Sequence, residues 1–445
     1  MTLASLETLK QDFSGDVILP EDNNYEQVRN AYIYKGSPAV VLRPNNAADV
    51  AAAIRYAKDR GLLLSIRSGG HSNAGHSTNN GGCVIDLSGI NQVEVIDTAK
   101  HIVRVGAGAK WGNVAKALQP HHLAISSGDT VSVGVGGLTQ GGGIGWMVRQ
   151  HGLAIDSLVA AEIVTADGSI LRASASENPD LFWGIRGGGG NFGVVTNFEF
   201  EAHPVGKVHA GVIMYALDDV PALVKGWRDY MRVAPEELSS ALLLMPNFAE
   251  FPPGAMVLVC YAGDDATATM KALDPLLKIA PVLQQHVNEK EYADVLEEAR
   301  PPAGIRILVR NAFVPEFTDD LVTTIAAAYA KSGTPALQIR SLGGAMNRVS
   351  ADATAFAHRN AEVLFIAAMF LPPDADDALI KTALKPWDAI SYTATGAYIG
   401  FFDSATAKEV AAIYPPATYQ RLARLKKQYD PQNTFNQNYN VTPAD

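Results

Sequence analysis

The chain has 445 residues, about three times a usual domain of ~150 residues, so its length predicts two domains. Hydrophobic residues make up 47% and charged residues 18%, which is typical of an ordinary soluble protein with an ample core. Acidic residues outnumber Lys plus Arg by 46 to 36, the formal charge is −10, and no basic tract stands out, which argues against nucleic acid as a partner.

No targeting or membrane segment is evident. Residues 1–24 lack the basic and apolar regions of a signal peptide. No apolar run approaches the ~20 residues that a membrane-spanning helix needs. Cys83 and Cys260 lie far apart without a disulfide framework, and the small apolar neighbours of Cys83 predict a buried structural thiol. We therefore expect a cytoplasmic protein that does not bind membranes.

The first half of the chain predicts short strands separated by glycine-rich loops. Residues 38–66 predict a strand, a helix and a second strand, with Asn46 as the N-cap and Gly61 at the end of the helix. Three further strands follow between residues 83 and 108, and then a helix. The run at 158–171 alternates like a hairpin with Asp167-Gly168 at its turn.

After about residue 205 the composition and the predicted secondary structure change, because glycine becomes scarce and helices alternate with strands. Helices are predicted at 220–234, 319–333 and 376–390, and strands at 256–263 and 362–371. A last helix ends at Asp430-Pro431, and an asparagine-rich tail follows. Such a polar tail needs hydrogen-bond partners, so we expect it to return to the first domain.

Three glycine-rich loops, at 66–82, 128–145 and 186–193, suggest a backbone that closely approaches a large, flat, anionic ligand. The alternative is that these glycines only form turns. The substring GGGNFG at 188–193 fits the dinucleotide pattern GxGxxG, but that pattern should open a helix, and here a strand-like run follows. It therefore does not predict a dinucleotide fold.

Four motifs carry a family resemblance, and they extend over nearly the whole chain: RSGGHS (67–72), GVGGLTQGGGIGWMVRQHGLAIDSL (134–158), LFWGIRGGGGNFGVVT (181–196) and YDPQNTFNQNYNVTP (429–443). With them the sequence resembles the vanillyl-alcohol-oxidase/p-cresol-methylhydroxylase superfamily of flavoproteins. Within it, the sequence is most similar to the berberine-bridge-enzyme-like branch and the bacterial 6-hydroxy-D-nicotine-oxidase type.

The resemblance implies an α+β fold. It comprises a two-subdomain FAD-binding domain of the p-cresol-methylhydroxylase type (1–205) and a substrate domain with an antiparallel sheet backed by helices (206–405). A C-terminal segment (406–445) returns to the FAD-binding domain.

The resemblance also implies FAD as cofactor, with its pyrophosphate wrapped by the backbone of RSGGHS and its 8α carbon bonded covalently to His71. An unprotonated imidazole can attack the quinone-methide tautomer of the flavin, and a pKa near 6.5 leaves much of it neutral at pH 7. The alternative for His71 is an ordinary hydrogen-bonded side chain, and for His76 we favour a polar loop residue. The expected cofactor-binding residues are Arg67, Ser68, Gly69, Gly70, His71, Ser72, Gly75, His76, Gly128, Asp129, Thr130, Ser132, Gly134, Gly137, Leu138, Gly142, Gly145, Val195, Asn438 and Asn440.

Many relatives attach FAD a second time, through a cysteine in the pattern GxCPxVG. The matching stretch here is GDTVSVG at 128–134, with Thr130 in place of the cysteine and Val131 in place of the proline. We therefore expect a single attachment, through His71, which favours a smaller or more enclosed substrate.

On the substrate side the sequence departs from the family. Many members carry a motif YxNYxD whose second tyrosine is the general base, but here, at 398–403, Gly400 replaces the asparagine and Phe401 the tyrosine. A general base accelerates alcohol oxidation by about 10²–10⁴-fold, whereas oxidation of a neutral amine needs no base. The absence of this tyrosine therefore favours oxidation of a C–N bond. The substrate-side candidates are Tyr398, Phe401 and Asn440.

Two alternatives stay open: an alcohol, sugar or polyphenol oxidase or dehydrogenase whose base lies elsewhere (Tyr392, Tyr398 or Tyr439), and a flavin-binding protein without turnover. Phe401 could also be simply a lining residue. We expect dioxygen as the acceptor, with room near Val133–Gly137, although a quinone or dye-like acceptor is the other possibility. The oligomeric state is expected to be monomer or homodimer.

Further residues complete the predicted site. Asn438 and Asn440 match a tail motif that caps the flavin edge or the substrate cavity, or they form a turn. Asp156 either lies near the cofactor or caps a helix. The histidines at 121, 122 and 151 lack metal-ligand spacing, and no GxSxG motif occurs, so neither a metal nor hydrolysis is predicted.

Overall fold

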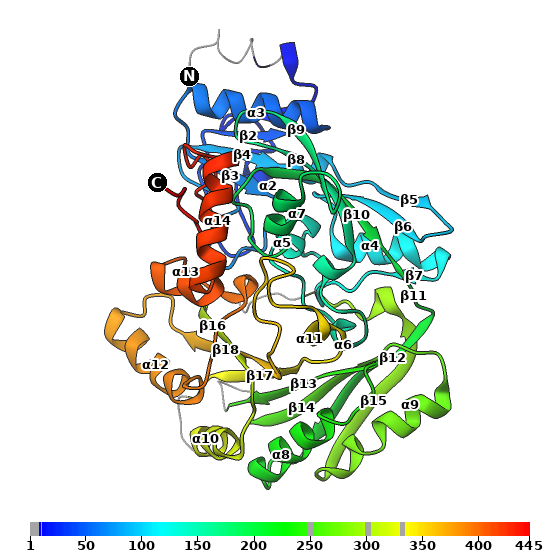
Figure 1. The fold of residues 1–445 in the computed structure, drawn as a ribbon. Coiled ribbons are helices and arrows are strands. Elements are labelled where there is room, and N and C mark those ends of the chain that lie inside the picture. The colour runs from blue at the N-terminus through cyan, green and yellow to red at the C-terminus, as the bar shows by residue number, and fades with distance from the viewer. Residues whose placement is uncertain (1–8, 10, 247–252, 299–303, 330–333) are drawn as a thin grey trace.

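The structure is a computed structural model that describes residue 9 and residues 11–246, 253–298, 304–329 and 334–445. Two smaller sheets from the first half of the chain lie together, and the largest sheet, from the second half, lies beside them (Figure 1). This mixed α and β architecture confirms the predicted α+β class.

The first sheet has four strands in the order β1-β2-β4-β3, of which β2, β4 and β3 run parallel. Helix α3 connects β2 to β3, and the Asn46 side chain caps it by accepting a hydrogen bond from the backbone N–H of Asp49. The predicted strand–helix–strand unit and its cap are thus confirmed. The bounds are β1 (Asp16–Ile18), α2 (Tyr25–Val28), β2 (Val40–Arg43), α3 (Ala47–Asp59), β3 (Leu64–Arg67) and β4 (Cys83–Asp86).

The second sheet is antiparallel, in the order β5-β6-β10-β8-β9. Strands β8 and β9 form the predicted hairpin, with Gly168 at φ +86° in its turn. The GGGNFG substring runs into strand β10 rather than a helix, which confirms that it is no dinucleotide motif. The bounds are β5 (Val93–Asp97), β6 (Ile102–Gly106), α4 (Trp111–Leu118), β7 (Leu123–Ala124), α5 (Val135–Gln140), α6 (Val148–His151), β8 (Leu158–Val164), β9 (Ile170–Ser174), α7 (Pro179–Ile185), β10 (Val194–Glu201) and β11 (His203–Pro204).

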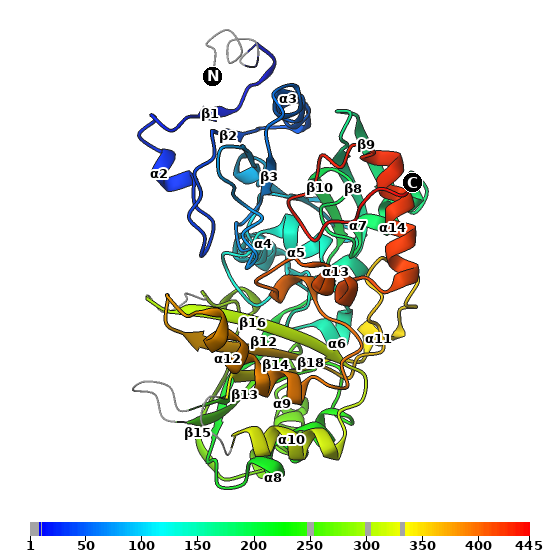
Figure 2. The same cartoon turned by 90° about the vertical axis from the view of Figure 1, so that its left-hand side faces the viewer.

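The third sheet has seven strands, all antiparallel, in the order β15-β12-β14-β13-β17-β18-β16. Helices α8 and α10 lie on the face that points away from the smaller sheets (Figures 1 and 2), and α12 packs against α10 and β18. The bounds are β12 (Lys207–Tyr215), α8 (Val220–Met231), β13 (Leu238–Met245), β14 (Gly254–Tyr261), α9 (Ala266–Leu273), β15 (Val282–Glu291), β16 (Arg306–Val314), α10 (Asp319–Tyr329), β17 (Ala336–Ser341), α11 (Ala345–Arg348), β18 (Val363–Leu371) and α12 (Asp377–Ile390).

Two large hydrophobic cores correspond to this arrangement. One packs the two smaller sheets with their helices, and the other packs the seven-stranded sheet against α8, α9, α10 and α12. A smaller cluster joins Ile144 and Leu153 from the first half of the chain to Phe313, Phe356 and Tyr398 from the second. This third cluster is buried, so it fixes the two halves against each other by hydrophobic burial.

The C-terminal segment packs on the first half of the chain. It contains α13 (Ala407–Ile413) and α14 (Pro416–Tyr429), and α14 lies against α7. Lys426 is fully buried, and its ammonium donates to the backbone carbonyls of Asn191 and Phe435 and pairs with Asp430 at 2.8 Å. Further along, the N–H of Val441 donates to the Asn191 side chain. The tail is therefore fixed beside the third glycine-rich loop.

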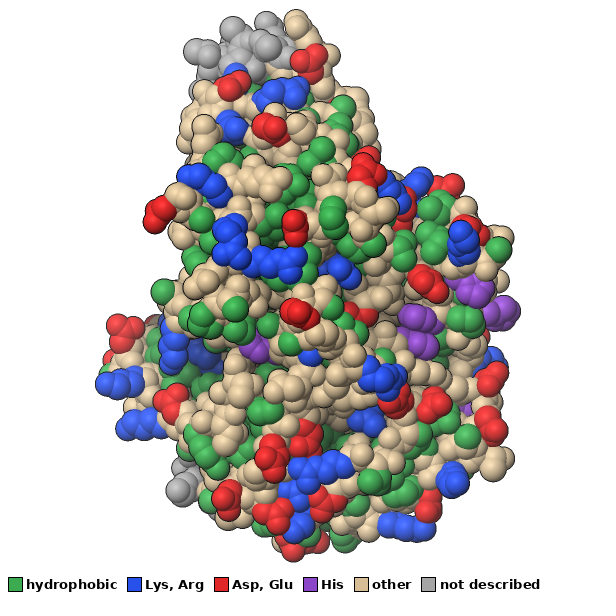
Figure 3. All heavy atoms as spheres, viewed as in Figure 1, with side chains coloured by type: hydrophobic (Ala, Val, Ile, Leu, Met, Phe, Trp, Pro, Cys, Tyr) green, Lys and Arg blue, Asp and Glu red, His purple; other side chains and the backbone are tan. Residues whose placement is uncertain are grey.

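Acidic and basic side chains are interspersed over the face shown in Figure 3. Among the helices that the structure describes, none has the length and apolar character needed to cross a bilayer.

Candidate active site

A cavity of about 420 Å³ lies where the glycine-rich loops meet the turn after α12 and the C-terminal tail. Most of its walls come from five stretches, at 64–77, 128–144, 189–195, 398–401 and 435–439. A volume of this size is typical of sites for cofactors and other small molecules, which occupy roughly 300–1,000 Å³.

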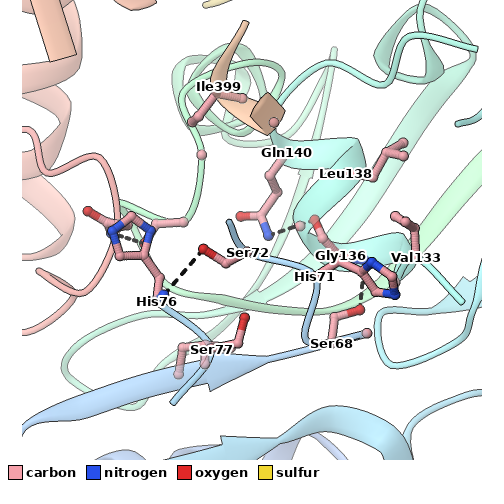
Figure 4. A pocket seen from close by; sticks show the side chains of 18 of the residues that line it. Ser68, His71, Ser72, His76, Ser77, Val133, Gly136, Leu138, Gln140 and Ile399 are labelled. Atoms are coloured by element: carbon pink, nitrogen blue, oxygen red, sulfur yellow. Dashed lines mark hydrogen bonds between the residues drawn. The ribbon is translucent and has the colours of Figure 1, made fainter. Parts of the chain in front are cut away.

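Two of the loops touch through their glycines. A Cβ on Gly69 would lie 2.2 Å from the backbone nitrogen of Gly134, and a Cβ on Gly134 would lie 2.0 Å from that of Gly69. Ser68 adds to this contact, because its hydroxyl donates to the Ala107 carbonyl at 2.6 Å and accepts from the N–H of Gly136 at 3.2 Å (Figure 4). Only residues without a side chain allow the loops to approach so closely.

The first loop presents an unusual run of free donors. The backbone N–H groups of Gly69, Gly70, His71 and Ser72 have no acceptor among the described residues. Consecutive N–H groups of this kind form a concave site for an anion. Arg67 does not reach the cavity itself; it pairs with buried Asp86 at 3.1 Å and thereby holds the start of the loop.

His71 lies at one end of this loop, beside Val133 and Gly136 (Figure 4). Its Nε2 is 2.8 Å from the hydroxyl of Ser132, and its ring stacks on Tyr32 with the centroids 4.4 Å apart. Ser132 in turn donates to the carboxylate of Glu298 at 2.6 Å. Burial lowers the pKa of His71 below its ordinary value, against an opposing effect of Glu298. The imidazole is therefore neutral at pH 7.

His76 lies on the other side of the loop and contacts the ring of Tyr439 edge-on, at 5.1 Å (Figure 4). Burial lowers its pKa to about 4. Its backbone N–H donates to the hydroxyl of Ser72 at 3.2 Å, which gives the loop its curvature. His76 is thus a neutral residue of the cavity wall.

The residues present fit a flavin dinucleotide. The oxygens Gln140 Oε1 and Asn438 Oδ1 belong to lining residues and are buried acceptors without a hydrogen-bond partner in the described part of the chain. A Cβ on Gly137 or Gly190 would meet no atom within 4 Å, so the backbone there borders open space. Unpaired acceptors suit the N–H group of an isoalloxazine ring, and the free amides of the first loop suit a pyrophosphate.

Neither thiol of the protein lies at the cavity. Cys83 and Cys260 are fully buried in strands β4 and β14, and burial raises the pKa of each thiol to about 12. Thr130 lines the cavity in their stead, and its hydroxyl donates to Asp129 at 3.1 Å.

The wall that the C-terminal half supplies is mostly apolar. Ile399 and Phe401 lie in a 3₁₀ turn there, next to Tyr398. Arg340, on β17, forms an ion pair with Asp129 and lies 5.6 Å from the centre of the Phe401 ring. Burial alone would raise the pKa of Asp129, but Arg340, together with the hydrogen bonds from Thr130 and the backbone, holds the pKa below its ordinary value.

Most of the sequence-predicted residues line the cavity, and six do not. The lining residues are Ser68, Gly69, Gly70, His71, Ser72, His76, Gly128, Asp129, Thr130, Gly134, Gly137, Leu138, Val195, Tyr398, Phe401 and Asn438; the others are Arg67, Gly75, Ser132, Gly142, Gly145 and Asn440. Gly142 and Gly145 make room for protein instead, since a Cβ would lie 2.9 Å from the Phe356 ring and 1.5 Å from the Ser127 carbonyl.

Asp156 does not line the cavity either. Its carboxylate accepts from the N–H of Leu153 and from Arg359 at 2.7 Å, so it links the two halves of the chain. Sequence reasoning missed the lining residues Tyr32 and Gln140, and it missed the roles of Glu298 and Arg340. Gln140 lies within the second glycine-rich loop, which could have marked it, whereas nothing in the local pattern marks Tyr32, Glu298 or Arg340. Across the described ranges, no group of three or more His, Cys, Asp or Glu side chains is arranged to hold a metal ion.

Comparison with known proteins agrees with this geometry. Residues 38–174 match the family model of an FAD binding domain, and residues 397–442 match the model described as berberine and berberine like. The chain is 30% identical to (R)-6-hydroxynicotine oxidase of Paenarthrobacter nicotinovorans over 96% of its own length and 97% of the relative. It is 29% identical to a xylooligosaccharide oxidase of Thermothelomyces thermophilus over 92% of its own length and 88% of the relative.

Among solved structures, 6-hydroxy-D-nicotine oxidase from Arthrobacter nicotinovorans superposes with a TM-score of 0.87, at 28% identity, over 97% of this chain and 98% of that one. These similarities extend over nearly the full length of both chains. The protein therefore belongs to the FAD-linked oxidoreductases of the berberine-bridge-enzyme-like branch of the vanillyl-alcohol-oxidase/p-cresol-methylhydroxylase superfamily, near the nicotine-oxidase type.

Proposed function

We propose that the protein is an oxidase that breaks a C–H bond next to the nitrogen of a small amine, with dioxygen as the electron acceptor. The observation that carries this proposal is Phe401 on the cavity wall, where many family members place a catalytic tyrosine. When bound, FAD accepts the hydride at N5 and passes two electrons on to the acceptor.

In this proposal the free N–H groups of residues 69–72 bind the pyrophosphate, and Gln140 and Asn438 accept hydrogen bonds from the ring edge. Asn440 Oδ1 is also buried without a partner among the described residues, but Asn440 does not line the cavity, so we assign it no contact with the ring. Residues 1–205 then form the FAD-binding domain, residues 206–405 the substrate domain, and residues 406–445 complete the first of them.

The three tyrosines that the sequence offers as alternative bases do not suit that task. Tyr398 is buried, its oxygen accepts from the N–H of Gly143 at 3.1 Å, and burial raises its pKa to about 12. The hydroxyl of Tyr439 donates to the Phe402 carbonyl at 3.1 Å, and burial raises its pKa as well. Tyr392 is 59% exposed and does not line the cavity. Neither Tyr398 nor Tyr439 is therefore ready to take a proton near pH 7.

A neutral amine suits such a site, because its nitrogen lone pair assists hydride departure without loss of a proton. Oxidation of an alcohol at this site would lack the rate acceleration of about 10²–10⁴-fold that a general base provides. One relative that is 30% identical is named for 6-hydroxynicotine, an amine, which supports this choice. The xylooligosaccharide oxidase makes a sugar the second candidate class.

Mixing the holoprotein with candidate donors without oxygen tests the proposal, because a substrate bleaches the yellow flavin. We expect secondary and tertiary amines to bleach it and simple alcohols and oligosaccharides to leave it oxidised. Bleaching by oligosaccharides alone would establish the second candidate instead. If every donor fails while dithionite bleaches the flavin, the protein binds flavin without turnover.

The variant Phe401→Tyr sharpens this test. It restores a phenol at the cavity wall, and the expected result is little change in the bleaching rate with amines, because they do not need the base. If the protein acts on alcohols, the same variant should speed their oxidation by on the order of 10²-fold. That gain would contradict the amine proposal.

We further propose that FAD is attached covalently through His71 alone. The neutral imidazole at the cavity supports the bond, and the absence of a thiol among the lining residues supports a single attachment. Acid precipitation of the holoprotein should leave the flavin in the pellet. The variant His71→Ala should release it to the supernatant, and flavin released from the unmodified protein would refute the tether.

A further inference from the structure

We propose that Glu298, acting through Ser132, sets the tautomer of His71 and removes its proton when the flavin is attached. The inference rests on the tether proposed above. Glu298 does not touch the cofactor in this scheme. It is therefore a positioning residue that accepts the proton of His71 through Ser132.

The hydrogen bonds determine which imidazole nitrogen is free. Ser132 has a single proton, which it donates to Glu298 Oε1 at 2.6 Å. The Ser132 oxygen must then accept from His71 Nε2, 2.8 Å away, so the proton of the neutral ring resides on Nε2. Nδ1 carries the lone pair, and no described residue donates a hydrogen bond to it. The chain of three groups therefore presents Nδ1 as the nucleophile.

The backbone holds Glu298 in this place. Residue Glu297 pairs with Thr130 as an isolated parallel bridge: its N–H donates to the Asp129 carbonyl and its carbonyl accepts from the N–H of Val131, each at 3.0 Å. These bonds fix the segment against the second glycine-rich loop. The next side chain, that of Glu298, is thereby brought to Ser132, although 166 residues separate the two.

In the covalent step His71 loses one proton and the 8α methyl group of the flavin loses another. A bond forms between Nδ1 and the 8α methyl carbon, and a C–H bond of that methyl breaks with loss of a proton. Positive charge would build on the ring, but Nε2 gives its proton to Ser132 as Ser132 gives its own to Glu298. Two electrons remain on the flavin until dioxygen takes them, with both protons, as hydrogen peroxide. A paired base of this kind activates a nucleophile in many enzymes.

Two charged residues and one aromatic ring surround the imidazole of His71. Glu298 favours its protonation, Lys110 opposes it, and the Tyr32 ring stacks on it. Burial has the largest effect and keeps the ring neutral at pH 7. The relay thus begins with a neutral imidazole and a carboxylate acceptor, which is the arrangement that the step requires.

The experiment follows attachment rather than turnover. Full-length apoprotein from riboflavin-starved cells is mixed with FAD in air, and the flavin held in the acid-precipitated pellet is measured over time. Quenching of flavin fluorescence before precipitation reports binding itself. The variants are Glu298→Gln, Glu298→Asp and Ser132→Ala, and the matched control is Glu297→Gln, whose exposed side chain makes no hydrogen bond with described residues.

We expect Glu298→Gln and Ser132→Ala to bind FAD normally but attach it on the order of 10²-fold more slowly, with Glu298→Asp in between and Glu297→Gln at the original rate. The original protein should reach a constant rate once His71 is neutral. Glu298→Gln should continue to accelerate toward alkaline pH, because hydroxide must remove the Nε2 proton.

Two results would overturn the inference and leave the tether intact: attachment by Glu298→Gln at the original rate, or equal slowing in Glu297→Gln, which would indicate a general charge effect. Attachment by Ser132→Ala at the original rate would overturn it too, even if Glu298→Gln failed to fold. Flavin that never enters the pellet of the original protein would overturn both the tether and the relay.

Discussion

Replacement of Lys426 by methionine should loosen the C-terminal tail and with it one wall of the cavity. The ammonium is fully buried and uses its three protons on Asp430, Asn191 and Phe435, each at 2.8 Å. Methionine fills similar space but leaves a buried carboxylate without its counter-charge. Breaking a buried ion pair in this way costs about 3–5 kcal/mol.

That cost has a local consequence that can be measured. At about 1.4 kcal/mol for each factor of ten, opening of the tail should become roughly two to four orders of magnitude more frequent. Hydrogen exchange followed by mass spectrometry should show faster exchange of the amides that Asp430 holds, those of Thr434 and Phe435. Retention of non-covalent FAD should fall too, because Asn438 and Tyr439 line the cavity.

The neighbouring, exposed Lys427 provides the control, since Lys427→Met changes the same charge without burial. The double variant Lys426→Met/Asp430→Asn should recover part of the loss, because no unpaired charge remains. Equal exchange rates in Lys426→Met and Lys427→Met would refute the inference that the buried Lys426–Asp430 pair holds the C-terminal tail in place.

Two more predictions follow from the site. Gly69→Ala should lower the melting temperature and the FAD content, because its Cβ would lie 2.2 Å from the nitrogen of Gly134 and such overpacking costs about 1–3 kcal/mol. The control is Gly206→Ala, whose Cβ would have its nearest atom at 4.0 Å and which should change neither quantity. Equal FAD content in both variants would contradict the close contact at Gly69. Thermal stability should also fall as the pH drops from 6.5 toward 4, because burial lowers the pKa of His76 and His151 to about 4 and only the unfolded chain binds protons over that range. His151→Gln should flatten this decline, and an unchanged slope would show that His151 contributes nothing to it.

Short-range patterns in the sequence predicted the local elements well. The Asn46 cap, the hairpin around Gly168 and the strand after GGGNFG depend on neighbouring residues, and the structure confirms each of them. The fold class followed from motifs that the family shares. Periodicity and turn chemistry act over a few residues, which is why a single sequence suffices for these features.

Long-range contacts could not be predicted in the same way. Glu298 and Arg340 are ordinary charged residues in sequence, and only the bridge at Thr130 and the seven-stranded sheet bring them to Ser132 and Asp129. The motif glycines illustrate the converse limit. A glycine pattern indicates close approach of the backbone, but whether a ligand or a protein side chain approaches, as at Gly142, depends on the tertiary structure.

The buried contacts of Lys426, which hold the C-terminal tail in place, have a consequence for biosynthesis. Asn438 and Tyr439 form part of the cavity wall, and Lys426 must be buried before they are held there. A nascent chain can assemble both smaller sheets while it is still attached to the ribosome, yet its cavity stays incomplete until residues 426–441 have emerged from the exit tunnel. We therefore expect stable binding of the cofactor only after these residues are in place, and a chain truncated before residue 426 should be purified without colour.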